Sequence, residues 1–152
     1  WAGGMRASPL TAQLEAECDR SGRVIVDADL RVPGTPQVFA AGDTARAVTD
    51  SLGHVSLMSC QHANRLGAVA GYNAAADLLG VATEPYRQKN YVTCLDLGPT
   101  AIFTRGWDSQ VEITGDEAQA MNREINTKWI YPPRADRTAA FETSEWARLV
   151  DY

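Results

Sequence analysis

Residues 35–43 have the sequence Thr-Pro-Gln-Val-Phe-Ala-Ala-Gly-Asp. Residues 37–41 are predicted to form a short apolar strand, of the kind that is buried on both faces of a sheet. The strand ends at Gly42-Asp43, which puts a carboxylate at the carboxyl edge of a sheet, where open α/β sheets bind ligands. Gly42 lets a phosphate or sugar approach closely, and Asp43 accepts hydrogen bonds from hydroxyl groups. A plain turn without a ligand is the alternative interpretation.

Short elements are predicted before this strand. Trp1–Gly4 is expected to end a strand in a tight glycine turn. A short helix is predicted to begin with Ser8 as N-cap and Pro9 as first residue and to end at Ser21-Gly22. Its apolar face consists of Leu10, Leu14 and Cys18. Residues 23–27 and 29–32 are predicted as the two strands of a hairpin around Ala28.

A long helix is predicted over residues 57–79, after a loop at 44–56. Ser56 or Ser59 is its expected N-cap, and Gly80 ends it. Small residues recur every four positions along one stripe of this helix, namely Ala63, Gly67, Gly71 and Ala75. Each glycine costs about 1 kcal/mol of helix propensity relative to alanine. We therefore expect another backbone, from a strand or a second helix, to pack closely against the stripe.

The pattern changes after Pro85. Strands are predicted over residues 89–97 and 100–105, with a weaker strand at 110–114. A helix follows over 116–129 and stops before Pro132-Pro133, and a short helix is expected over 142–150. The predicted fold class is therefore α+β. The domains are predicted as 1–83, 84–133 and a tail at 134–152.

Composition excludes several classes of protein. The 152 residues carry 14 Lys+Arg and 19 Asp+Glu, a formal net charge of −5, and the isoelectric point is near 5.0. This balance argues against a nucleic-acid partner or an anionic membrane surface, which need clustered basic residues. The sequence has no apolar run long enough for a membrane span. Three widely spaced cysteines argue for a reducing compartment, and we expect the cytoplasm.

Other chemistry has weak support in the sequence. Cys60 and His62 are two positions apart, so they do not face one ligand on a helix. We therefore predict no metal site, including one completed by His54 or Cys94. Cys60 lacks a nearby partner cysteine for disulfide chemistry. The sequence has no Gly-x-Ser-x-Gly elbow and no phosphate loop, and we assign no catalytic residue.

The Gly42-Asp43 segment resembles the second flavin-binding motif of flavoproteins with two dinucleotide-binding domains. Trp1–Arg6 is similar to the glycine turn where the NAD(P) domain returns to the FAD domain, and Gly3 lies in that turn. The segment Met58-Ser59-Cys60-Gln61-His62-Ala63 resembles the start of the flavin-facing helix. Residues 91–98, with Gly106-Trp107-Asp108 and residues 125–133, are similar to the C-terminal part of type II NADH dehydrogenase-like proteins.

The resemblance implies a role for each of these residues. Asp43 would hold the ribityl chain of FAD, and Gly42 would admit it. The helix start at Gln61, His62 and Ala63 would stabilise reduced flavin, because a helix N-terminus carries partial positive charge. Gln61 and His62 would also line a pocket on the side of a quinone.

A further implication concerns the extent of the chain. The family carries Gly-x-Gly-x-x-Gly turns for FAD and NAD(P)H, and the 152 residues contain neither. The chain is therefore expected to be a C-terminal fragment, with a remnant of a FAD-binding α/β domain and a small sheet-and-helix interface domain. The absence of an initiator Met agrees with this expectation.

The parent protein is expected to pass a hydride from NAD(P)H to FAD and on to an acceptor, a quinone. It is expected to be a homo-oligomer without a membrane span, with peripheral membrane contact as an option. The isolated fragment is expected to be inactive. The alternative is a non-catalytic interaction or dimerisation module that binds no cofactor.

Overall fold

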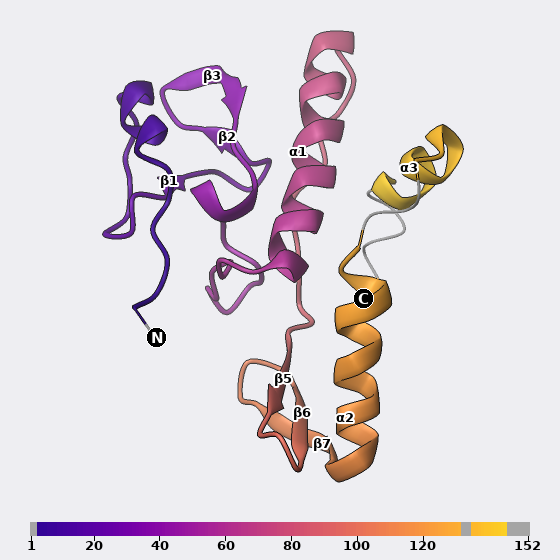
Figure 1. Ribbon diagram of the computed structural model, residues 1–152. Coiled ribbons are helices and arrows are strands. Elements are labelled where there is room, and N and C mark those ends of the chain that lie inside the picture. The colour runs from indigo at the N-terminus through magenta and orange to yellow at the C-terminus, as the bar shows by residue number, and fades with distance from the viewer. Residues whose placement is uncertain (1–2, 132–134, 146–152) are drawn as a thin grey trace. The chain divides into compact units, whose positions relative to one another are not determined.

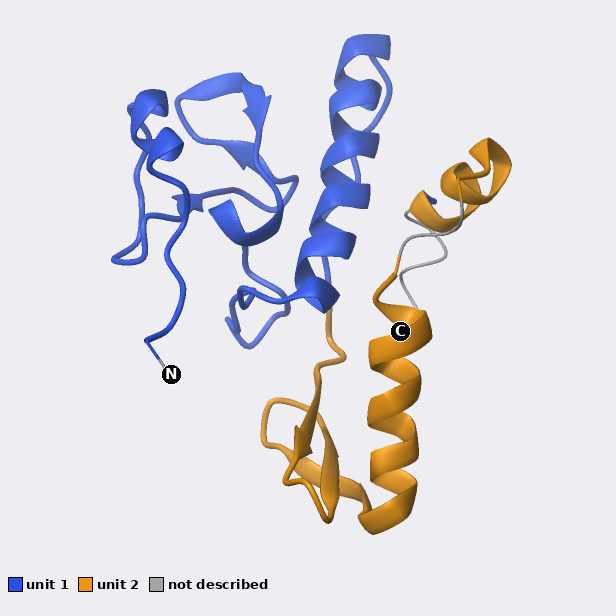
Figure 2. Ribbon diagram, in the orientation of Figure 1, with its two compact units in different colours: residues 1–87, 145–151 blue, residues 88–144, 152 orange. Residues whose placement is uncertain are grey.

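The computed structural model describes residues 3–131 and 135–145. The chain divides into two compact units (Figure 2). Unit 1 comprises residues 1–87 and 145–151, and unit 2 comprises residues 88–144 and 152. Trp1 and Ala2 of the predicted first turn lie outside the described residues. So do the Pro132-Pro133 stop and most of the helix expected over 142–150.

Unit 1 begins with a short helix that ends earlier than predicted. Helix η1 (Pro9–Leu14) is a 3-10 helix, and the Ser8 side chain accepts a hydrogen bond from the Leu10 amide. The extension of this helix to Gly22 was wrong. The Asp19 carboxylate accepts the amides of Ser21 and Arg23 and also the Arg23 guanidinium. These bonds form a turn that leads into the next strand.

Four short strands form two separate pairs (Figure 1). β1 (Val24–Ile25) pairs parallel with β4 (Ala45–Arg46), and β2 (Arg31–Val32) pairs antiparallel with β3 (Thr35–Phe39). The predicted hairpin of residues 23–27 with 29–32 was therefore wrong. The chain does turn there, because the Asp27 carboxylate accepts the amides of Asp29 and Arg31. Each flanking strand then pairs with a different segment.

Strand β3 is less buried than predicted. It was expected to be covered on both faces, but Pro36 and Gln37 are exposed and Val38 and Phe39 are half-buried. Among the described residues β3 pairs with β2 alone. The Arg31 guanidinium lies 4.4 Å from the centre of the Phe39 ring and partly shields it from water.

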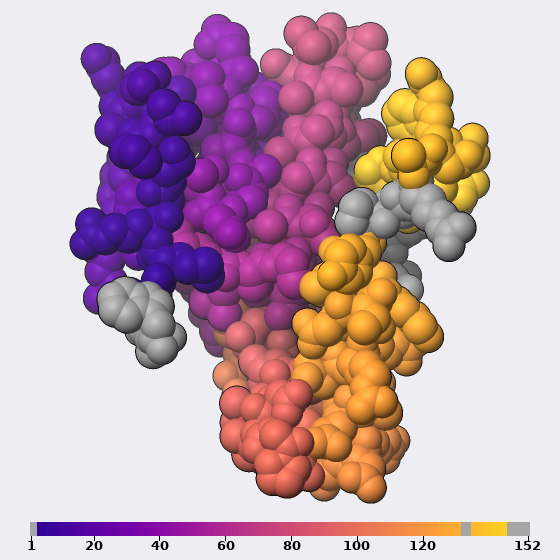
Figure 3. Space-filling model, in the orientation of Figure 1, coloured from indigo at the N-terminus to yellow at the C-terminus, as the bar shows by residue number. Residues whose placement is uncertain are grey.

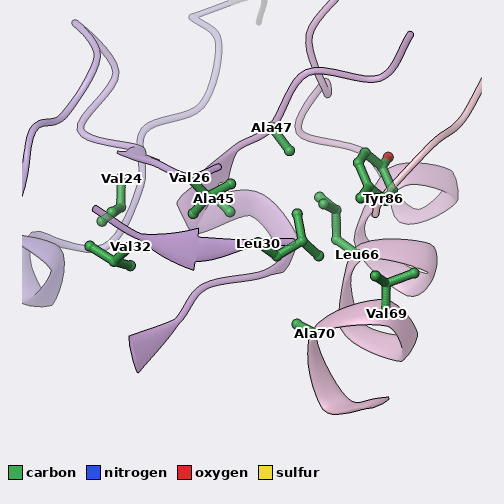
Figure 4. Close-up of a cluster of buried hydrophobic side chains, with 10 residues drawn as sticks. All are labelled: Val24, Val26, Leu30, Val32, Ala45, Ala47, Leu66, Val69, Ala70 and Tyr86. Atoms are coloured by element: carbon green, nitrogen blue, oxygen red, sulfur yellow. The ribbon is translucent and has the colours of Figure 1, made fainter. Parts of the chain in front are cut away.

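Helix α1 (Cys60–Leu79) confirms the predicted long helix. Ser59 is its N-cap, and Gly80 ends it in the left-handed region at φ 67°, a conformation that favours glycine. One face of α1 carries Leu66, Val69 and Ala70 into the core of unit 1 (Figure 4). The other members of this cluster are Val24, Val26, Leu30, Val32, Ala45, Ala47 and Tyr86.

A buried asparagine joins α1 to its surroundings. The Asn73 side chain has no exposed surface. Its amide nitrogen donates to the carbonyls of Asp29 and Glu84, each at 2.8 Å, and its oxygen accepts from the Glu84 amide at 2.8 Å. No local sequence pattern indicates this contact, because the partners lie 44 and 11 positions away.

The small-residue stripe of α1 is open in this structure. Gly67 and Gly71 are exposed, and a Cβ built on either would have no described neighbour within 4 Å outside the helix backbone. The outer surface of this helix can be followed in Figure 3, where its C-terminal half is pink. The neighbouring backbone that the stripe predicts is therefore not among the described residues.

Unit 2 begins with a sheet and a helix, as predicted. β5 (Val92–Asp96), β6 (Ala101–Arg105) and β7 (Gln110–Thr114) form an antiparallel sheet in chain order. Helix α2 (Gly115–Glu124) covers one face and continues as a π-helical turn, η3 (Ile125–Trp129). Ala101, Phe103 and Ala118 form the centre of this core.

A third helix begins earlier than expected. α3 spans Arg137–Ser144, and the Asp136 carboxylate accepts the Ala139 amide at 2.8 Å, as an N-cap does. The mixed α+β composition of the chain is confirmed. None of the helices within residues 3–131 and 135–145 has both the length and the apolar character needed to cross a membrane.

We predict that Asn73→Ala destabilises the chain strongly. The substitution removes three hydrogen bonds and leaves partly buried backbone groups of Asp29 and Glu84 without their partner, so the free energy of unfolding should fall by about 2–4 kcal/mol. Urea denaturation measures the change. Asn64→Ala, on the exposed face of the same helix, should change it by less than about 0.5 kcal/mol. An equal change in the free energy of unfolding for Asn73→Ala and Asn64→Ala would show that the Asn73 hydrogen bonds do not stabilise the fold.

We predict that Gly67→Ala stabilises this 152-residue chain. The added methyl group meets open space, so the helix should gain about 1 kcal/mol from better propensity. Gly42→Ala is the matched control, because φ 69° at Gly42 makes a side chain cost about 1–2 kcal/mol. Destabilisation of the 152-residue chain by Gly67→Ala would show that a backbone already covers the stripe.

Candidate functional site

The Gly42-Asp43 turn follows β3 and has a conformation that requires glycine. The Ala40 amide donates to the Leu30 carbonyl at 3.0 Å, and Ala41 is extended with φ −145° and ψ 172°. Gly42 then enters the left-handed region at φ 69°, and the 3-10 turn η2 (Gly42–Thr44) leads into β4. A Cβ built on Gly42 would have no described neighbour within 4 Å. The backbone of Gly42 is therefore accessible to a ligand.

Asp43 lies in this turn with an exposed side chain. The turn is fixed by the Thr44 hydroxyl, which donates to the Ala41 carbonyl at 3.0 Å, and by the Ala45 amide, which donates to the Gly42 carbonyl. An exposed carboxylate on a fixed turn can accept two or more hydrogen bonds from hydroxyl groups.

The structure brings η2 into contact with helix α1. At the start of α1, Cys60 is exposed, Gln61 and Ala63 are half-buried, and His62 is buried. The first turn contains no acidic residue. Cys60 and His62 thus differ in exposure.

His62 lies behind the first turn of α1. Its ring has no exposed surface, and its Nδ1 atom is 2.9 Å from the Ser59 hydroxyl oxygen. Burial lowers the pKa of His62 to about 4, so the ring is neutral at pH 7. The sequence placed His62 in the first turn but gave no indication of its bond to Ser59. The Ser-x-x-His spacing is the signal that could have suggested it.

The segment before α1 is more ordered than the expected loop. Val48 and Val55 form an antiparallel bridge. The Ser56 amide donates to the Ala47 carbonyl at 2.9 Å, and Arg23 Nη1 donates to the Ser56 carbonyl at 2.5 Å. These contacts fix the chain three residues before the N-cap of α1.

Gly3 does not belong to this cluster of elements. It lies in an exposed segment without regular structure that precedes η1. Its predicted role at the cofactor stays a prediction.

The residues at η2 and α1 fit the flavin that the sequence pattern implies. Gly42 offers accessible backbone, Asp43 offers a carboxylate for hydroxyl groups, and α1 offers a helix N-terminus without acidic side chains. A polyol chain and an electron-rich ring edge need these groups.

Comparison with known proteins shows what the chain is similar to. Residues 1–67 match the family described as pyridine nucleotide-disulphide oxidoreductase. The chain is 48% identical over 145 residues to NADH dehydrogenase-like proteins of two Mycobacterium tuberculosis strains, a match that covers 92% of this chain and 36% of each relative. The chain is thus similar to the pyridine nucleotide-disulphide oxidoreductases over residues 1–67 and to NADH dehydrogenase-like proteins over 92% of its length.

A further relative gives a shorter match. A type II NADH:quinone oxidoreductase of Mycobacterium tuberculosis is 50% identical over 48 residues, which cover 28% of this chain and 10% of the relative. The chain spans about a third of the length of the NADH dehydrogenase-like relatives, 36% of each.

We predict that His62 makes the stability of the chain fall with acid. The ordinary pKa of 6.5 applies in the unfolded chain and a value of about 4 in the folded one, so the unfolded state binds a proton first as the pH falls through this window. Stability is thus complete above about pH 6.5 and decreases towards pH 4, with a loss of about 2 kcal/mol between pH 7 and pH 5.

Urea denaturation at the two pH values measures this difference. His62→Leu is the control, since it should remove most of the pH dependence between pH 7 and pH 5. An unchanged dependence in that variant would assign the effect to other groups.

Proposed function

We propose that the protein containing this chain is a FAD-dependent NAD(P)H dehydrogenase that passes a hydride from NAD(P)H to FAD and on to a quinone. The family and the names of the relatives support a redox function. The quinone is proposed because one relative is named an NADH:quinone oxidoreductase. When bound, FAD supplies the capacity to accept and release hydride equivalents.

The observation that carries the proposal is the Gly42-Asp43 turn in contact with α1. Asp43 accepts hydrogen bonds from the hydroxyl groups of the ribityl chain. Gly42 keeps the space beside it clear, because a side chain there would be strained at φ 69° and would occupy the open volume. The turn thus fixes the cofactor's polyol chain.

Helix α1 contributes the electrostatic part of the proposed site. The N-terminus of an α-helix carries roughly half a positive charge. Reduced flavin carries negative charge on its pyrimidine edge. The first turn of α1, which includes Gln61 and Ala63, therefore favours the reduced state of the cofactor.

The proposed organisation assigns residues 1–83 to part of a FAD-binding domain, 84–133 to an interface domain and 134–152 to a tail. Gly3 would belong to the turn that joins the NAD(P) and FAD domains. We place the parent protein in the cytoplasm, as a homo-oligomer with peripheral membrane contact as an option.

The 152 residues alone are proposed to be inactive, since they hold no glycine-rich pyrophosphate turn. One observation favours an interaction role for them in isolation. Leu78 and Leu79 at the end of α1 are 87% and 76% exposed, next to the open stripe, and exposed apolar surface favours association.

The test is FAD binding by the full-length parent protein with Asp43→Ala. Loss of hydrogen bonds to a charged acceptor costs about 1.5–3 kcal/mol, so the dissociation constant for FAD should rise about 10- to 100-fold. Flavin fluorescence measures it. Glu117→Ala removes an exposed carboxylate from unit 2 and should leave the affinity unchanged. Equal affinity of the Asp43 variant and the unmodified protein would refute the role of Asp43.

A further inference from the structure

The positive end of α1 lacks the compensation that helices usually have. Acidic residues are favoured in the first turn of a helix because they neutralise its partial positive charge. Helix α2 follows this rule with Asp116 and Glu117. The first turn of α1, Cys60-Gln61-His62-Ala63, has no acidic residue. Its positive charge is not balanced by any carboxylate of its own turn.

The N-cap residue does not compensate this charge either. Ser59 has the extended backbone that an N-cap requires, with φ −154° and ψ 152°, yet its side chain makes no capping hydrogen bond. Its carbonyl accepts the amides of His62 and Ala63 at 3.1 and 2.9 Å. A serine in this position normally accepts an amide of the first turn through its hydroxyl oxygen, as Ser8 does in η1.

The hydroxyl of Ser59 is engaged by His62 instead. The oxygen lies 2.9 Å from His62 Nδ1, and the imidazole is fully buried, so the core fixes the position of the ring. Because burial keeps His62 neutral at pH 7, the bond adds no charge beside the helix. The bond to His62 therefore takes the Ser59 hydroxyl away from the amides of α1. It adds no negative charge that would offset the positive end of the helix.

We propose that His62 is a positioning residue that holds the Ser59 hydroxyl away from the amides of α1, so that the positive end of the helix acts undiminished on the bound flavin. This inference rests on the proposed function. It deepens that function because it assigns the tuning of the reduction potential to a side chain that does not contact the cofactor. His62 therefore belongs to the proposed site through Ser59 and the helix.

The test is the reduction potential of flavin bound to the full-length parent protein, titrated against a reference dye. In His62→Leu the Ser59 hydroxyl is released and caps the helix. The ratio of FAD affinities in the reduced and oxidised states should then fall about tenfold, which lowers the potential by about 30 mV for a two-electron couple.

Two further variants separate positioning from a general structural effect. Ser59→Ala combined with His62→Leu removes the released cap and should restore the potential. His62→Asn retains a hydrogen-bonding atom near the place of Nδ1 and should keep the original value. Ala70→Gly weakens the same helix away from its start and should leave the potential unchanged.

Each outcome has a distinct meaning. A lowered potential in His62→Leu with recovery in the double variant supports the inference. An unchanged potential in a His62→Leu protein that binds FAD overturns it and leaves the proposed function intact. If His62→Leu does not fold, Ser59→Ala alone decides: an unchanged potential supports the inference, and an altered one shows that Ser59 acts directly. A full-length protein that binds no flavin refutes the proposed function and the inference with it.

Discussion

The buried face of α1 is the contact on which the rest of unit 1 depends. Leu66, Val69 and Ala70 pack into a cluster with residues of all the surrounding segments. Pairs of two-stranded sheets as short as these are at best marginally stable alone in water. The two strand pairs persist because the helix gives both of them an apolar surface to cover, and Asn73 adds three hydrogen bonds to the same interface.

The same contact positions the proposed flavin site. Because α1 packs on the core and contacts η2, the position of its first turn relative to the η2 turn is fixed. The groups proposed to act on the ligand lie at the ends of elements: Gly42 and Asp43 after a strand, and the first turn of α1 at the start of the helix. Groups at such positions can contact a ligand, while the residues in the interior of the elements stabilise the fold. His62 links the two roles, since its ring is part of the interior and its Nδ1 atom bonds the cap residue.

The sequence predicted elements whose signals are local. Helix α1 ends at Gly80 and begins beside Ser59, and unit 2 follows its chain order because its strands pair with sequential neighbours. The predictions were wrong where contacts with distant segments or hydrogen bonds of polar side chains determine the local structure. Val24 pairs with Ala45 instead of forming the predicted hairpin. The Asp19 carboxylate forms a turn with the amides of Ser21 and Arg23 where the helix was predicted to continue. Periodicity carries no information about either interaction. At the candidate site, a local pattern led to Gly42 and Asp43, whose role stays a prediction, whereas the bond between Ser59 and His62 depends on burial that only the folded core creates.

We propose that this chain forms part of a flavin-dependent NADH dehydrogenase, and the absorption spectrum of the full-length protein decides the proposal. The full-length protein should be yellow, and its flavin bands should bleach when NADH is added in the absence of an acceptor and return when a quinone is supplied. A correctly folded full-length protein that is colourless, takes up no FAD and does not oxidise NADH would contradict it.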